Sequence, residues 1–158
     1  MSDDVTVLGL ASRGDSDRLS VWRVEVQVKG DGSVEVVELD RWQGTRGRDD
    51  ASQLIDVHDA IVNVLDSPRL GTVCAVAVKR TESPRGRPSN PYDRKVRFEG
   101  AAMLAAHAQG KRYFGYRKIQ LGRGSDLAKQ ARAAAATPLD DEALEALDAA
   151  CAALCDVG

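Results

Sequence analysis

The chain has 158 residues, of which 43% are hydrophobic, and a formal net charge of −2. This length is typical of one domain, and the apolar content excludes an intrinsically disordered chain. No apolar run approaches the roughly 20 residues that span a membrane, and the start, Met-Ser-Asp-Asp, lacks the basic and apolar regions of a secretory leader. The odd count of three cysteines favours a reducing, cytoplasmic location without a disulfide framework.

The first forty residues predict three antiparallel strands. They are Val5–Ala11, Leu19–Val28 and Val34–Leu39. Leu19–Val28 alternates apolar and polar side chains, which predicts a strand with one face in the core and the other in solvent. Lys29–Ser33 contains Asp-Gly, which supplies the positive φ angles of a hairpin turn.

Helices and strands alternate in the rest of the chain. Helical spacing predicts a helix from Asp49 or Asp50 to about Leu65, and the apolar run Thr72–Val78 predicts a strand covered on both faces. The later elements are a helix from about Asp93 to Gln109, a strand over Arg112–Lys118, a helix capped by Ser125, and a last helix with Thr137 as its cap and Pro138 at its first position. This order predicts an α/β fold, a mixed sheet with helices on both faces, in one domain over 1–158.

Positive charge is concentrated in the centre of the chain. Residues 79–123 hold twelve basic and three acidic side chains, a net charge of +9, whereas the rest holds 10 basic and 21 acidic side chains, a net charge of −11. Such a patch attracts polyanions, because Lys and Arg release condensed counterions when they contact phosphates. The alternative is a solvated surface rich in arginine. The proline-rich, basic connection over 79–95 is predicted to be a flexible loop. We expect phosphate contacts from Lys79, Arg80, Arg85, Arg87, Arg94, Lys95, Lys118, Arg123 and Lys129.

Two cysteines, Cys151 and Cys155, lie four residues apart on the last predicted helix. Two thiols alone make a poor zinc site, whereas a free cysteine behaves as a small hydrophobic side chain. We therefore expect both to fill the core.

Short segments along most of the chain match a known pattern. They are Val7-Leu-Gly-Leu10, Ala75–Val78, Met103–Ala106, Gly122-x-Gly124 followed by Lys129-Gln130, and Asp148–Cys151. Together with the element order β-β-β-α-β-α-β-α-α, they resemble the RuvC family of Holliday-junction resolvases, which have a ribonuclease H-like fold. The resemblance covers about Val5 to Leu154. It implies a dimer that uses four acidic residues and two Mg²⁺ ions to cut branched DNA.

The chain departs from this pattern at the acidic positions. Ala11 and Lys79 stand at the first two, and Asp148 and Cys151 stand at the terminal pair. A cation at Lys79 repels Mg²⁺, which prefers carboxylate oxygen ligands. We therefore expect a RuvC-like protein without a cofactor that binds branched or duplex DNA, or another nucleic acid, through its basic surface and does not cut it.

Two other functions stay open. An active Mg²⁺-dependent, structure-selective endonuclease would need relocated acids, with Asp148, Glu82 and Asp15 or Asp17 as catalytic carboxylates and Asp148 as a metal ligand. A dimeric protein-interaction module would instead use the small-residue helix over 97–109 as a homodimer contact.

Overall fold

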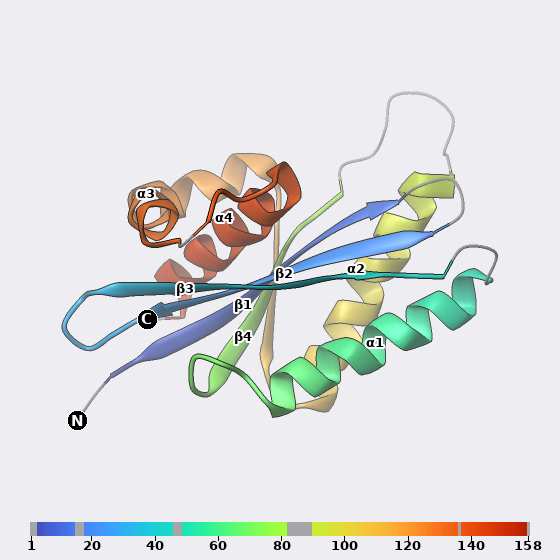
Figure 1. The fold of residues 1–158 in the computed structure, drawn as a ribbon, viewed down its shortest axis with the longest axis horizontal. Helices are drawn as coiled ribbons and strands as arrows, with labels where there is room; N and C mark the ends of the chain where they lie inside the picture. The colour runs from blue at the N-terminus through green and yellow to red at the C-terminus, as the bar shows by residue number, and fades with distance from the viewer. Residues whose placement is uncertain (1–2, 15–17, 46–48, 82–89, 136, 158) are drawn as a thin grey trace.

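A computed structural model describes residues 3–14, 18–45, 49–81, 90–135 and 137–157. Several residues of predicted function therefore lie outside the described residues: Asp15, Asp17, Glu82, Arg85 and Arg87. Within the described part, five strands form one sheet in the order β3-β2-β1-β4-β5, with helices on both of its faces (Figure 1).

The sheet is mixed, as the element order predicts. Strands β1 (Val5–Gly14), β2 (Leu19–Val28) and β3 (Val34–Gln43) form an antiparallel meander. Strands β4 (Val73–Lys79) and β5 (Arg112–Tyr116) run parallel to β1 on its other side. The carboxyl ends of β1, β4 and β5 consequently meet at one edge of the sheet, where parallel α/β sheets commonly bind ligands.

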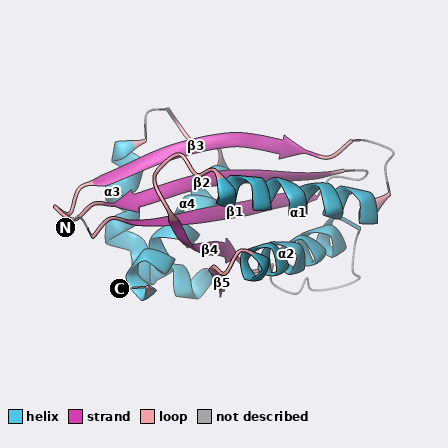
Figure 2. Cartoon of the chain, turned by 90° about the horizontal axis from the view of Figure 1, so that it is seen from below, coloured by secondary structure: helices cyan, strands magenta, loops and turns pink. Residues whose placement is uncertain are grey.

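The helices form one layer on each face of the sheet (Figures 1 and 2). Helices α1 (Asp50–Asp66) and α2 (Asn90–Ala108) cover one face. The other face is covered by α3 (Ser125–Ala134) and α4 (Asp141–Asp156), which follow the 3-10 helix η1 (Lys118–Gly124). Among the described residues, no helix has the length and apolar character needed to cross a membrane.

The pleat of the strands divides the core into two parts, because successive side chains point to opposite faces. On β1, Val7 and Ala11 pack with α3 and α4, whereas Leu8 and Leu10 pack with α1 and α2. The strand β4 is buried on both faces, as predicted, apart from the exposed Cys74.

Two glycines set the position of α4 over the sheet. A Cβ at Gly9 would overlap the backbone oxygen of Ala146 and lie 3.0 Å from the Cβ of Ala150. A Cβ at Gly124 would lie 2.6 Å from the backbone nitrogen of Ala152. Both glycines therefore let backbone approach backbone, and α4 lies against β1 and η1 more closely than any side chain would permit.

The prediction that β2 has one solvent-facing side is wrong. Glu25 is fully buried and Gln27 is 8% exposed, because the connection between α1 and β4 covers them. The backbone N–H of Leu70 donates to Glu25 at 3.0 Å, and Gln27 donates to the Leu70 carbonyl at 2.6 Å. The buried polar side chains thus form hydrogen bonds with backbone N–H and C=O groups of this connection.

Three helix starts also differ from their predictions. Helix α2 begins at Asn90 and places Pro91 in its first turn, where a missing N–H costs nothing. Ser125 is the first residue of α3 and not its cap. Helix α4 begins after Asp140 and not after Thr137, because the Thr137 hydroxyl donates to Glu38 of β3 and the Asp140 carboxylate accepts from Trp22 of β2.

Candidate functional site

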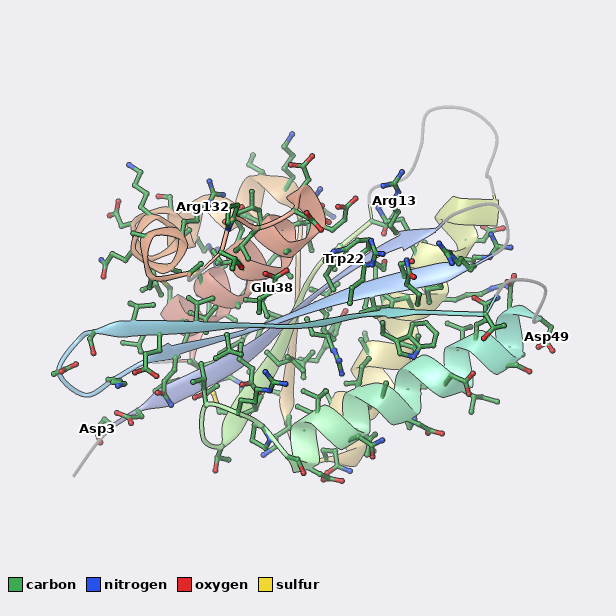
Figure 3. The ribbon with its side chains drawn as sticks, viewed as in Figure 1. Asp3, Arg13, Trp22, Glu38, Asp49 and Arg132 are labelled. Carbon is green, nitrogen blue, oxygen red and sulfur yellow. The ribbon has the colours of Figure 1, made fainter. Side chains whose placement is uncertain are left out.

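A cavity of about 480 Å³ lies where β4 and β5 end, between η1, α3 and α4. Its basic side chains come from the end of β4, from η1 and from α3: Lys79, Lys118, Lys129 and Arg132. Figure 3 shows Arg132 within the α3–α4 layer above the sheet. The cavity therefore brings together basic residues that are up to 53 positions apart in the sequence.

The pleat of β4 places Lys79 in this cavity. Ala75 and Ala77 pack on the α4 side of the sheet, and Lys79 continues the alternation at the end of the strand. The register pairs Leu10 of β1 with Val78 of β4, so Ala11 and Lys79 follow at neighbouring positions of the two strands. Lys79 thus lies beside the small, buried Ala11, at the edge of the sheet where β1 and β4 meet.

The opposite wall of the cavity is acidic. It is formed by Asp141, Glu145 and Asp148 of α4, whose spacing of four and three residues places them on one face of the helix. Two ion pairs cross from the basic side to this wall. Lys79 Nζ lies 3.8 Å from Glu145 Oε2, and Arg132 Nη2 donates to both carboxylate oxygens of Asp148 at 3.0 Å.

Two of the four basic side chains can offer their positive charge to a ligand without first breaking an ion pair. Lys118 and Lys129 have no carboxylate within ion-pair distance among the residues that the structure describes. Among the residues that the structure describes, the lining holds four basic and three acidic side chains, a formal charge of +1. The cavity therefore retains a modest attraction for anions after its internal pairing.

An ion pair and a hydrogen bond hold the start of α4 to the sheet. Arg13 of β1 lies 3.8 Å from Glu142, and Trp22 Nε1 donates to Asp140 at 3.4 Å. Figure 3 shows Arg13 and Trp22 on the side of the sheet that α4 covers. These contacts fix the acidic wall relative to β1, β2 and β4.

The residues of this cavity do not fit the Mg²⁺ site that the family resemblance implies. Asp148 accepts from Arg132, and the positions before it are occupied by Ala11 and Lys79. Cys151 is fully buried, and burial raises the pKa of its thiol to about 12, which keeps it protonated and a poor ligand. Within the described ranges, no group of three His, Cys, Asp or Glu side chains could hold a metal ion.

Four residues predicted to contact phosphate lie away from this cavity. Arg80 follows Lys79 and lines a separate cavity with Glu99 and Tyr113 on the α2 side of β5. Arg94 and Lys95 belong to α2, on the opposite face of the sheet, where Arg94 pairs with Asp50 at 2.9 Å. Arg123 lies 3.5 Å from Asp156, at the far end of α4. The structure thus brings together three of the predicted residues: Lys79, Lys118 and Lys129.

The cysteine prediction is confirmed for one residue and wrong for the other. Cys151 fills the core between α4 and the sheet. Cys155 is exposed, and its Sγ contacts the Arg123 carbonyl at 3.6 Å. The one-turn spacing of the two thiols did not predict this, because Cys155 lies beside η1 and not in the core cluster that contains Cys151.

Sequence reasoning missed several residues of the cavity, among them Arg132, Asp141, Leu144 and Glu145. A signal for Arg132 was present, because it lies one turn after Lys129 on the predicted helix and so shares its face. The sequence of the last predicted helix also shows that it is rich in acidic residues. Which of them would face the basic residues depends on how α4 crosses the sheet, and that crossing is set by the close approach at Gly9.

The mixed sheet, its strand order and its two helical layers define a ribonuclease H-like fold of the RuvC type. The chain is similar to the solved structure of Thermus thermophilus RuvC, with a TM-score of 0.71 and 18% sequence identity over 97% of this chain and 95% of that chain. It is equally similar to T. thermophilus RuvC in complex with a Holliday junction substrate, with a TM-score of 0.71 and 18% identity over 97% and 94% of the two chains.

This likeness shows the fold. No protein-family model matches the sequence. No curated protein matches it either.

Proposed function

We propose that this protein binds nucleic acid at the basic wall of the α3–α4 cavity and does not cut it. The observation that carries the proposal is Lys79 at the end of β4, inside a cavity that also holds Lys118 and Lys129. The RuvC of T. thermophilus, which shares the fold, has been solved with a Holliday junction substrate. In this chain, Lys79 would supply the positive charge that meets a backbone phosphate.

Binding without cleavage is supported by what surrounds the carboxylates. Two of the acids form ion pairs across the cavity. Glu145 pairs with Lys79, and Asp148 pairs with Arg132. A carboxylate engaged in this way has less negative charge to offer a hard cation, and Lys79 adds repulsion. Phosphate contacts of this kind position a strand and carry little sequence information, so we expect recognition of shape.

The test follows binding and cleavage in the same samples. Labelled four-way junction, duplex and single-stranded DNA are titrated with the protein in EDTA, Mg²⁺ and Mn²⁺ across a salt series. Salt-sensitive binding with uncut DNA in both metals is the expected result. Metal-dependent cutting would instead favour an endonuclease in which Glu82 or Asp15 joins Asp148, and absence of binding at low salt would refute a nucleic-acid function.

A second candidate function is self-association through α2. Val96, Met103 and Leu104 are 41%, 50% and 64% exposed, which is unusual for side chains of this size. Gly100 lies among them, and a Cβ there would meet nothing within 4 Å, so this helix face is open to close approach. Small and apolar residues on one helix face suit packing against a second copy of the helix.

Sedimentation equilibrium tests this candidate. A dimer through α2 should persist at high salt, because its contact is apolar, and the pair of substitutions Met103→Glu and Leu104→Glu should convert it to a monomer. Ile119→Glu changes an equally apolar, exposed side chain on η1 and should leave the dimer intact. A monomeric wild-type chain at all concentrations would exclude the candidate.

A further inference from the structure

The α3–α4 cavity is larger than a lone phosphate contact requires. Its volume of about 480 Å³ falls in the range of roughly 300–1,000 Å³ that is typical of small-molecule sites. Part of its lining is apolar: Leu121 of η1, Ala128 of α3 and Leu144 of α4. A backbone phosphate makes no use of such a surface, whereas the flat, weakly polar face of a nucleobase does.

The polar groups of the cavity are divided between its walls. Lys118 and Lys129 stand on the η1–α3 side, and Asp141 stands on α4. Asp141 has no basic side chain within ion-pair distance among the described residues, so its oxygens can accept hydrogen bonds from a ligand. One ligand that reaches both walls must therefore carry an anionic group at one end and N–H or O–H donors at the other.

The charge of the lining limits how many phosphates can enter. The formal charge of +1 on the described lining residues balances one phosphodiester, which carries one negative charge. A second phosphate would face the carboxylates of Asp141, Glu145 and Asp148 and be repelled. These acids thus allow one nucleotide unit and exclude a run of backbone.

We infer that the cavity holds one unpaired nucleotide of a single strand, with its phosphodiester among Lys79, Lys118 and Lys129, its base against Leu121 and Leu144, and a base N–H donor at Asp141. This inference rests on the proposed nucleic-acid binding and adds a preference for unpaired strands. A base inside a regular duplex is stacked and paired, and taking it out costs a few kcal/mol, so duplex DNA binds less tightly.

The experiment compares two single strands of equal length and charge. One is a labelled oligodeoxyadenylate, and the other has the same phosphates with abasic sugars. We expect wild-type protein to bind the adenine strand about tenfold more tightly, which is what burying roughly 55 Å² of apolar base surface supplies. Leu144→Ala should remove most of this difference, whereas Ile55→Ala, which shortens an exposed side chain of α1, should leave it unchanged.

A second variant serves if Leu144→Ala does not fold. Asp141→Ala removes both acceptor oxygens from an exposed position, and we expect it to reduce the preference for adenine by about fivefold, the value of one net hydrogen bond. Equal binding of the two strands by wild-type protein would overturn the inference, as would a loss of affinity in Leu144→Ala that is the same for both strands. If junction, duplex and single strands all fail to bind at low salt, the proposed function itself is wrong.

Discussion

Arg132 on α3 donates from Nη2 to both carboxylate oxygens of Asp148 on α4, each over 3.0 Å. Asp148 is the one acid at the four positions where the RuvC resemblance implies metal ligands, so its partner decides what it can do. A guanidinium in this position neutralises the carboxylate and fills the space in front of it. The contact also ties α3 to α4 and forms one side of the cavity.

Asp148→Asn tests whether this carboxylate serves structure or metal. The pair is partly exposed, with Arg132 49% and Asp148 26% accessible, so we expect the free energy of unfolding to fall by no more than about 1 kcal/mol. Urea unfolding measures this change. Thermal unfolding with and without Mg²⁺ provides the second readout, and Mg²⁺ should shift neither protein. A Mg²⁺-dependent stabilisation that is present in wild type and lost in the variant would identify Asp148 as a metal ligand.

Gly9→Ala tests the close approach that positions α4. The added Cβ would overlap the Ala146 backbone oxygen, so α4 must shift, and we expect the free energy of unfolding to fall by about 3 kcal/mol or more. Gly100→Ala is the matched control on α2. Its Cβ meets nothing within 4 Å, and Ala exceeds Gly in a helix by roughly 0.5–1 kcal/mol, so this variant should be more stable than wild type. Equal effects of the two substitutions would refute the packing described for α4.

Glu25 should make stability depend on pH in a defined direction. Burial raises the pKa of this carboxyl above its ordinary value, and the N–H groups of Arg69 and Leu70 offset only part of the effect. Because the folded-state pKa exceeds the unfolded one of about 4.3, the folded chain binds more protons, and the contribution of Glu25 to stability falls as pH rises through this window. The stability of wild type relative to Glu25→Gln should therefore decline from about pH 4 upward and level off above the folded-state pKa. Urea unfolding at several pH values measures it, and a relative stability that rises with pH would contradict this assignment.

Much of the fold could be predicted from short-range patterns in the sequence. The alternation of β2, the unbroken apolar run of β4 and the Asp-Gly turn are short-range signals, and the strands lie where these signals put them. The alternation of side chains along β4 places Lys79 on the α4 side of the sheet. The position of this central residue of the candidate site could therefore be predicted from the sequence.

Long-range contacts account for what the sequence could not predict. Glu25 looks like a solvent-facing residue of β2, and its burial depends on a connection 44 residues later. The start of α4 shifted because Thr137 and Asp140 bind side chains of β3 and β2. The pairing of Arg132 with Asp148 likewise depends on how two helices meet, and no spacing rule within one helix contains that information.

The most direct test of the account concerns Lys79, whose charge we place against a nucleic-acid phosphate. Lys79→Glu reverses that charge inside the cavity, whereas Lys111→Glu makes the same change in net charge at the other end of β5. The measurement is the affinity for labelled single-stranded DNA as a function of salt concentration. We expect Lys79→Glu to weaken binding and to reduce the slope of log affinity against log salt by about one, with little change of slope in Lys111→Glu. Identical affinities and slopes for the two variants would show that the cavity does not bind the phosphate backbone.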